Sequence, residues 1–209
     1  MTQELARSGL LGIQSTPVPL ERELRTPRLV LRRWRDTDRS PFAALNADLL
    51  VMEHFPAPLR PNESDDLADR IEAGFEERGW GLWAVEVPGT TPFAGFVGLN
   101  PATFDASFTP AVEVGWRLAR DHWGRGYATE GARAALSFGF DELALDEIVS
   151  FTTHGNARSR RVMERLGMRR DPADDFDNPN LPDGDALRPH VLYRLDRAAW
   201  QRNAARAAR

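Results

Sequence analysis

Hydrophobic and polar positions in the middle of the chain follow two different periods, one directly after the other. The run from Val112 to Leu118 alternates as a partly buried strand does and is rich in β-branched and aromatic residues. From Tyr127 to Phe140, apolar and small residues recur at steps of three and four, which is typical of one face of a helix. A turn that carries Gly124 and Gly126 separates the two runs. The pattern therefore predicts a strand, a glycine turn and a helix.

A second junction of the same kind follows about thirty residues later. Residues 148–153 read as a strand, and Asn156 is well suited to cap the helix that comes next. The apolar stripe of that helix consists of Val162, Met163 and Leu166. Gly167 stands where a left-handed residue would close it.

The rest of the chain predicts shorter elements around these two junctions. We expect a strand at 28–34, a helix capped at Asp36 and running to Asn46, a helix capped at Asn62 and running to about Arg78, a hairpin of 80–87 and 93–99, and a final strand at 188–195. The hairpin leads into the Val112 strand, which gives three neighbouring antiparallel strands. Residues 1–23 are expected to form a flexible leader, 24–197 one domain, and 198–209 a frayed helix or tail.

Composition narrows the class of protein. The 209 residues are 28% charged and 42% hydrophobic, as is usual for one soluble globular domain. The absence of cysteine excludes disulfides, thiolate metal sites and a cysteine nucleophile. No apolar run is long enough to cross a bilayer, so a cytoplasmic location is the default expectation. A net charge of −4 disfavours broad nucleic-acid affinity.

The glycine turn before the predicted helix suits an anion. The first N–H groups of a helix lack partners inside it, and the helix dipole places partial positive charge there. Gly124 and Gly126 allow left-handed backbone angles and close approach, and Arg125 adds a fixed charge. A diphosphate is the ligand that best fits such a site. The alternative is that the two glycines form only a tight connection.

These two blocks together resemble the signature of the GNAT acyl-CoA-dependent N-acyltransferases. The superfamily motif Gln/Arg-x-x-Gly-x-Gly/Ala falls on residues 123–128, where Trp123 departs from the consensus. A tryptophan followed by Gly-Arg-Gly-Tyr-Ala-Thr-Glu is similar to the branch around the ribosomal-protein acetyltransferases RimJ and RimL, as is the block Asn-x-x-Ser to Leu-Gly-Met. The opening Thr-Pro-Arg-Leu-Val-Leu-Arg resembles the first strand of that family. The resemblance runs from about Arg25 to Tyr193.

The resemblance implies a fold and an activity. The expected fold is α+β, a single GNAT-type domain with a mixed, mostly antiparallel twisted sheet of about seven strands, about four flanking helices and a V-shaped cleft between the central strands. The expected reaction moves an acetyl group from acetyl-CoA directly to a primary amine, without a metal. The acceptor is a small molecule or a protein N-terminus, and a homodimer is left open.

The resemblance also implies roles for individual residues. Glu113 is the expected general base, and its apolar neighbours would raise its pKa; the alternative is an ordinary surface or salt-bridged glutamate. Many GNAT enzymes have a tyrosine for the leaving thiolate at the position of Met163, and Ser159 is the expected substitute here. Asn156 would hold the pantetheine arm. The residues expected to bind the coenzyme are Trp116, Arg117, Leu118, Trp123, Gly124, Arg125, Gly126, Tyr127, Ala128, Thr129, Asn156, Ser159 and Arg160.

Several alternatives remain open at this level. The chain could be a catalytically silent acyl-CoA-binding regulatory module, or its arginine-rich blocks could contact RNA or a ribosome. His54 is more easily explained as structural than as catalytic. The acidic segment 171–185 is expected to be either an amine-attracting lid or a solvated loop, since its spacing does not fit a calcium loop.

Overall fold

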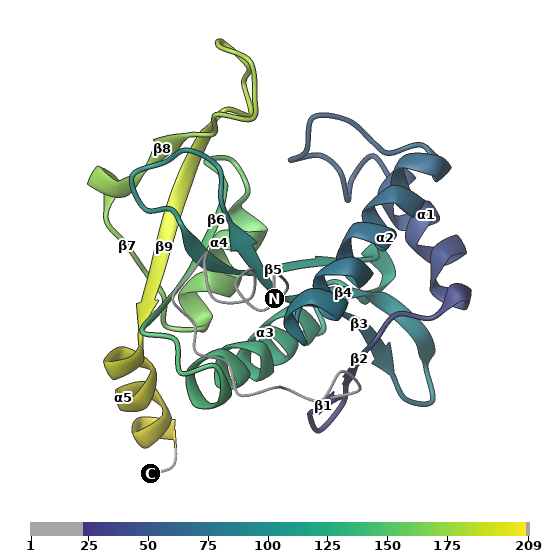
Figure 1. The fold of residues 1–209 in the computed structure, drawn as a ribbon, viewed down its shortest axis with the longest axis horizontal. Coiled ribbons are helices and arrows are strands. Elements are labelled where there is room, and N and C mark those ends of the chain that lie inside the picture. The colour runs from purple at the N-terminus through teal and green to yellow at the C-terminus, as the bar shows by residue number, and fades with distance from the viewer. Residues whose placement is uncertain (1–22, 208–209) are drawn as a thin grey trace, which may run out of the picture.

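The computed structural model describes residues 23–207, so residues 1–22 of the predicted leader lie outside the described part of the chain. The elements are β1 (Leu24–Arg25), β2 (Val30–Arg32), η1 (Asp36–Asp38), α1 (Arg39–Ala47), α2 (Pro61–Arg78), β3 (Leu82–Val87), β4 (Thr91–Ala102), β5 (Ala111–Leu118), η2 (Arg120–His122), α3 (Tyr127–Ser137), the π-helical turn η3 (Phe138–Glu142), β6 (Glu147–Thr153), α4 (Ala157–Arg165), β7 (Arg169–Arg170), η4 (Pro172–Asp174), β8 (Phe176–Asp177), β9 (Pro189–Asp196) and α5 (Arg197–Ala207). Figure 1 shows their arrangement.

One mixed sheet runs through the described chain. Its order is β1-β2-β3-β4-β5-β6-β9-β7, with β8 paired to β9, and β5 with β6 is its parallel pair. This confirms the α+β fold and the three neighbouring antiparallel strands β3, β4 and β5. The nine strands exceed the predicted number of about seven because β1, β7 and β8 have two residues each, too few to leave an alternation in the sequence. The fifth α-helix is α5, where a frayed helix or tail is predicted.

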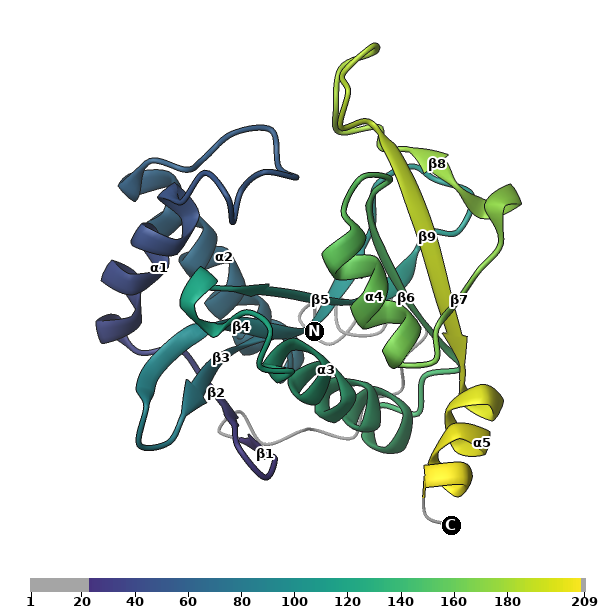
Figure 2. The ribbon, with the colours of Figure 1, turned by 180° about the vertical axis from the view of Figure 1, so that it is seen from behind.

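Side chains from the two faces of the sheet form two hydrophobic clusters. On one face, Trp83 and Val97 pack with α3 and with Phe75 of α2. On the other face, Ala84 and Phe96 pack with α1. Successive residues of a strand point to opposite faces, so the alternation of β3 and β4 between the clusters follows from strand geometry. Figure 2 shows these helices and strands from behind.

Two helices begin at residues other than the predicted ones. Helix α2 begins at Pro61 with Arg60 as its N-cap, not at Asn62, because proline at the first helical position loses no hydrogen bond. The Glu63 carboxylate accepts a hydrogen bond from the Arg60 N–H at 2.7 Å and completes this start. Before α1, the chain first forms the turn η1, and Asp38 rather than Asp36 precedes the helix.

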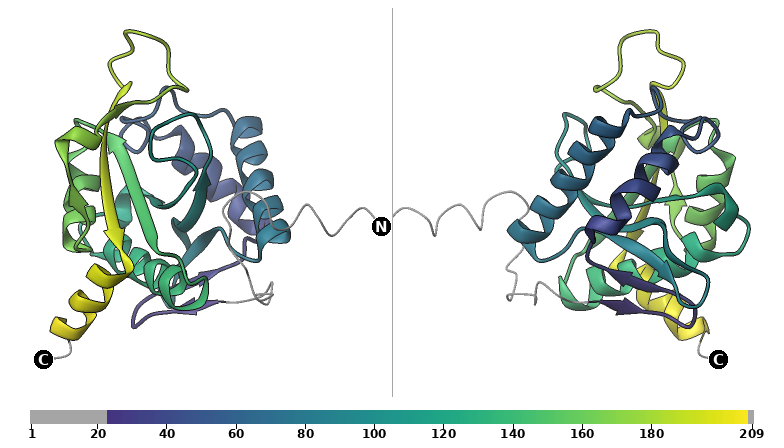
Figure 3. Two further views of the ribbon diagram at one scale, coloured as in Figure 1. Left: turned by 60° about the vertical axis from the view of Figure 1, so that its left-hand side comes forward. Right: turned by 90° about the vertical axis from the view of Figure 1, so that its right-hand side faces the viewer.

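Strands β5 and β6 diverge soon after they meet. Their parallel register joins Glu113 to Val149, whereas the other edge of β5 pairs with β4 over its whole length, from Ala111 to Leu118. Beyond Glu113 the two strands move apart, which places the start of α3, the start of α4 and the α1–α2 connection around the same space. In Figure 3, α5 lies well away from this region.

Candidate active site

The glycine loop ends in a left-handed residue that begins α3. Gly124 has a φ of 71° and Gly126 a φ of 81°, a region that side-chain-bearing residues avoid. The first hydrogen bond inside the helix runs from Glu130 N–H to Gly126 O at 3.0 Å. The earlier N–H groups therefore have no partner inside the helix, as at any helix start. A Cβ built on Gly124 meets nothing within 4 Å, so the loop surface is open to a ligand.

Contacts from the β1–β2 turn hold this loop in place. The Glu130 carboxylate accepts hydrogen bonds from Thr26 Oγ1 at 2.6 Å and from Arg28 Nε at 2.7 Å. Arg28 also donates to the carbonyl of Arg125 at 2.9 Å. Burial raises the pKa of Glu130, but the hydrogen bonds from Thr26 and Arg28 outweigh it and hold that pKa below its usual 4.5. The Thr-Pro-Arg segment thus fixes the geometry of the glycine loop.

Trp123, the departure from the family consensus, closes the end of β5. Its indole Nε1 donates to the Leu118 carbonyl at 2.8 Å. The Arg158 guanidinium lies over the indole ring at 4.5 Å, a cation–π contact that joins the loop to α4. This residue therefore connects the strand, the glycine loop and the second helix.

The space between the diverging strands is a cleft of about 740 Å³. The structure brings most of the predicted site residues to its walls: Glu113, Trp116, Arg117, Leu118, Trp123, Gly124, Gly126, Tyr127, Ala128, Thr129, Asn156 and Ser159. A volume of this size lies within the range of small-molecule and cofactor sites. Strand, loop and helix starts that are far apart in the sequence thus share one cavity.

Glu113 lies at the point where β5 and β6 meet, and its half-buried side chain opens on the cleft. Burial raises the pKa of its carboxyl from 4.5 to about 8. Removal from water disfavours the charged form, and no opposing charge compensates for it within the described chain. Near neutral pH such a carboxyl can exchange a proton with a bound amine.

Helix α4 supplies the facing wall. Asn156 caps it by accepting a hydrogen bond from Ser159 N–H at 3.1 Å, as predicted, and donates to Thr152 Oγ1 at 2.9 Å. Both ends of the Asn156 amide therefore already have a protein partner. Ser159 lines the cleft, half-buried, and Met163 lies behind it with 1% of its surface exposed. A methionine thioether has no proton to donate.

The arginines of the two blocks differ in what they face. Arg161 and Arg165 line the cleft. Arg160 does not line it, because its guanidinium points toward Tyr193 and the carbonyl of His154. The role of Arg160 in binding the coenzyme stays a prediction.

Other charged residues of these blocks are paired within the protein. Arg158 pairs with Glu53 at 2.6 Å, and Arg120 lies 3.9 Å from Asp48. The side chain of Arg125 is absent from the cleft walls, although its carbonyl takes part in holding the loop. These pairs reduce the positive charge available to a nucleic acid, so the structure adds no support for an RNA contact.

The α1–α2 connection, residues 48–60, crosses toward the β6 side of the cleft (Figure 1). His54 Nδ1 lies 3.2 Å from Thr153 Oγ1, and burial lowers the pKa of His54 below its usual 6.5. His54, Phe55 and Pro56 line the cleft. His122, Phe151 and His190 also line the cleft, although the sequence did not single them out. No local sequence pattern marks them, because only the folding of the chain brings them to the cleft.

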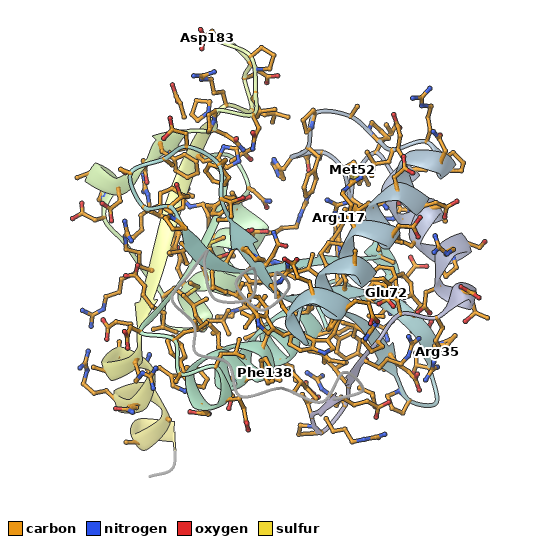
Figure 4. The ribbon with its side chains drawn as sticks, in the orientation of Figure 1. Arg35, Met52, Glu72, Arg117, Phe138 and Asp183 are labelled. Atoms are coloured by element: carbon orange, nitrogen blue, oxygen red, sulfur yellow. The ribbon has the colours of Figure 1, made fainter. Side chains whose placement is uncertain are left out.

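Several aspartates of the acidic segment 171–185 form ion pairs with arginines. Asp175 pairs with Arg170, Asp174 with Arg194 at 2.7 Å, and Asp183 with Arg188 at 2.8 Å. Figure 4 shows Asp183 at the tip of the projecting loop. The parts of this loop that line the cleft are Asn178, Asn180 and Leu181, which are uncharged. The choice between an amine-attracting lid and a solvated loop stays open.

Between residues 23 and 207, no group of three or more histidine and acidic side chains is placed to hold a metal ion. No helix in that range has the length and apolar character needed to span a membrane.

Comparisons with known proteins agree with this geometry. A family model described as an acetyltransferase (GNAT) domain matches residues 28–169. The Bacillus subtilis (strain 168) protein YkkB is 32% identical over 147 residues, which are 70% of this chain and 84% of that protein. The FsC-acetyl coenzyme A-N(2)-transacetylase of Aspergillus fumigatus is 34% identical over 49% of this chain and 42% of that protein. The crystal structure of an acetyltransferase from Agrobacterium tumefaciens str. C58 superposes with a TM-score of 0.67 at 27% identity, covering 86% of this chain and 95% of that one.

Proposed function

Because the chain belongs to the GNAT acetyltransferase family, we propose that it transfers an acetyl group from acetyl-CoA directly to a primary amine held beside Glu113. The observation that carries the proposal is one cleft that contains both an open helix start and a carboxyl with a pKa of about 8. The first suits a diphosphate and the second suits an amine. Neither group alone would specify acyl transfer.

The residues present fit a coenzyme A diphosphate. The N–H groups from Arg125 to Thr129 precede the first internal hydrogen bond of α3, and the left-handed Gly124 and Gly126 leave the backbone uncovered. Arg161 and Arg165 add positive charge on the α4 side. The backbone of β5 from Trp116 to Leu118 would pair with the extended pantetheine arm, because β6 does not continue in register beside it.

The coenzyme would supply a thioester, whose acetyl group is activated toward an amine. Glu113 would accept the proton that the attacking amine loses, directly or through water. Backbone N–H groups of β5 would stabilise negative charge on the carbonyl oxygen. The Ser159 hydroxyl would donate a hydrogen bond to the departing thiolate, since Met163 has no proton to give. The cysteine-free chain cannot form an acyl-cysteine, in keeping with direct transfer.

Assignment to the RimJ/RimL-like branch is also part of the proposal. It is supported by Trp123, whose indole joins β5 to the glycine loop, and by the run from Gly124 to Glu130. The competing hypothesis is a module that binds acyl-CoA without turnover. Glu113 separates the two, because binding does not require a general base and turnover does.

The test measures thiol release from acetyl-CoA with a panel of amines, using wild type, Glu113→Gln and the control Glu77→Gln on the exposed face of α2. Wild type and the control should turn over at the same rate. Glu113→Gln should lower kcat by roughly 10²–10⁴-fold and leave the affinity for coenzyme A unchanged. Equal silence of all three proteins across the panel, with coenzyme A still bound, would favour the binding module.

A further inference from the structure

Arg117 is a half-buried cation on the wall of the cleft. One guanidinium nitrogen donates to Asn46 Oδ1 at 2.6 Å, while Nε is buried with no hydrogen-bond partner. Within residues 23–207, no carboxylate forms an ion pair with it, and burial lowers its pKa from 12.5 to about 10. A buried guanidinium nitrogen is normally hydrogen-bonded and a cation removed from water is normally paired, so this arrangement needs an explanation.

The surroundings hold the guanidinium in one place. The ring centroid of Phe55 lies 4.0 Å from the guanidinium carbon Cζ of Arg117, and the ring centroid of Phe96 lies 5.4 Å from it. These two aromatic rings fix the plane of the guanidinium. Asn46 is itself oriented by a hydrogen bond to Ser64 Oγ at 2.9 Å, and both residues are 0% exposed. Figure 4 labels Arg117 beside α1, α2 and their connection. Two buried polar side chains therefore serve to position this one cation.

Arg117 and Glu113 share one face of β5. They are four residues apart with Gly115 between them, so their Cα atoms lie about 13 Å apart along the strand. Gly115 presents no side chain to the space between them, and a Cβ there would meet only the Glu113 carboxyl at 3.6 Å. An extended ligand could therefore reach both side chains. The diphosphate-binding start of α3 lies on other elements, so Arg117 is not needed there.

We propose that Arg117 binds a carboxylate of the acceptor, so that the preferred acceptor is a primary amine carrying a negative charge at some distance from its nitrogen. This proposal rests on the proposed function and narrows its substrate class. A short acidic peptide or a long amino acid carries its amine and a carboxylate on separate groups and could therefore contact both Glu113 and Arg117, which stand four residues apart on one face of β5. A carboxylate in the cleft would accept charge-assisted hydrogen bonds from the Arg117 guanidinium and would balance its charge.

The same charge disfavours other amines. A polyamine or an amino sugar would bring a second cation toward Arg117 in a space where water screens poorly. The paired acids of the 171–185 segment would not offset that repulsion. Among the acceptor classes that the fold allows, the cationic ones are therefore expected to be poor substrates.

The test uses matched acceptors that differ only in charge. Peptides with free N-termini carry either Glu or Gln as the second or third residue, and a series of straight-chain amino acids is compared with their amides. Wild type should prefer each acid over its amide by roughly 10–100-fold in kcat/KM. The peptide and amino-acid arms show which source of carboxylate the site accepts.

Three variants identify the residue responsible. Arg117→Gln should remove the preference by slowing the acids while changing the neutral amides by less than about threefold, and Arg117→Lys should keep part of it. Arg202→Gln, on exposed α5, is the matched control and should behave as wild type. Thermal unfolding of each variant shows whether it folds. Equal use of acids and amides by wild type overturns the inference and leaves the acetyltransferase proposal standing.

Binding of the products tests the inference without turnover. Calorimetry compares N-acetyl peptides that carry Glu or Gln at the same position. The acid should bind wild type at least tenfold more tightly than the amide and should lose this advantage in Arg117→Gln. Equal binding of both overturns the inference even if every amine proves unreactive, an outcome that would count separately against the proposed function.

Discussion

Replacing Glu113 by glutamine should change the pH dependence of folding stability as well as of catalysis. The pKa of about 8 in the folded protein lies above the 4.5 of the exposed group, so the folded state binds more protons than the unfolded state between these values. The free energy of unfolding of wild type should therefore fall as pH rises from about 4.5 to about 8. Glutamine resembles the protonated acid in shape and has no charge to bury, so it should abolish this fall.

The size of the effect follows from the same pair of values. The gap between 4.5 and about 8 corresponds to roughly 5 kcal/mol at about 1.4 kcal/mol per pH unit. The half-buried carboxyl opens on the cleft, where solvent screening reduces this upper bound, and we expect about 1–3 kcal/mol. The variant should thus match wild type near pH 4.5 and exceed its stability by that amount at pH 9.

Urea unfolding at pH 5, 7 and 9 measures the difference, and thiol release at the same pH values measures activity. Wild-type kcat/KM should rise with pH toward a plateau above about 8, because the base must be ionised to accept a proton. Glu113→Gln should be the more stable protein at pH 9 and the less active one throughout. A constant stability difference between pH 5 and pH 9 would mean that Glu113 titrates as an exposed glutamate, and the general-base argument would be refuted.

Three other substitutions test the glycine loop, its support and the α4 wall of the cleft. Gly126→Val should cost about 1–2 kcal/mol of stability because of the φ of 81°, and should weaken coenzyme A binding in calorimetry, whereas unchanged affinity would remove the loop from the site. Glu130→Gln should destabilise the protein by about 1 kcal/mol in urea unfolding. Because the pKa of Glu130 is lowered in the folded protein, this loss of stability should be complete above pH 4.5 and should shrink as pH falls further. A loss of stability that grows in acid would contradict the hydrogen bonds from Thr26 and Arg28. Ser159→Ala should lower kcat about tenfold with stability unchanged, since Asn156 caps α4 through the Ser159 backbone; an unchanged kcat would exclude Ser159 as the donor to the thiolate.

Local chemistry made the two strand-to-helix junctions predictable. Gly124 and Gly126 adopt the left-handed angles that only glycine takes easily, and Asn156 caps α4 with the side chain expected of it. Both depend on neighbours within a few residues, which a sequence pattern records. The start of α2 was missed because Pro61 and Glu63 together make a better helix start than Asn62.

Long-range contacts could not be predicted in the same way. The surroundings of Arg117 depend on Asn46 and Phe55, which contact it from more than sixty residues away in the sequence. The ion pair between Asp174 and Arg194 likewise joins two elements that lie twenty residues apart in the sequence. The composition of residues 171–185 predicts an acidic surface, whereas the charge of that surface also depends on the arginines that lie beside it in the fold.

The central claim is that the open start of α3 holds the diphosphate of coenzyme A beside the Glu113 carboxyl, and calorimetry with coenzyme A tests it most directly. Wild type should bind one molecule per chain, more weakly as salt rises, and Gly124→Val and Gly126→Val should bind less tightly although they remain folded. Absence of heat with wild type at millimolar coenzyme A, or equal affinity in all three proteins, would contradict it.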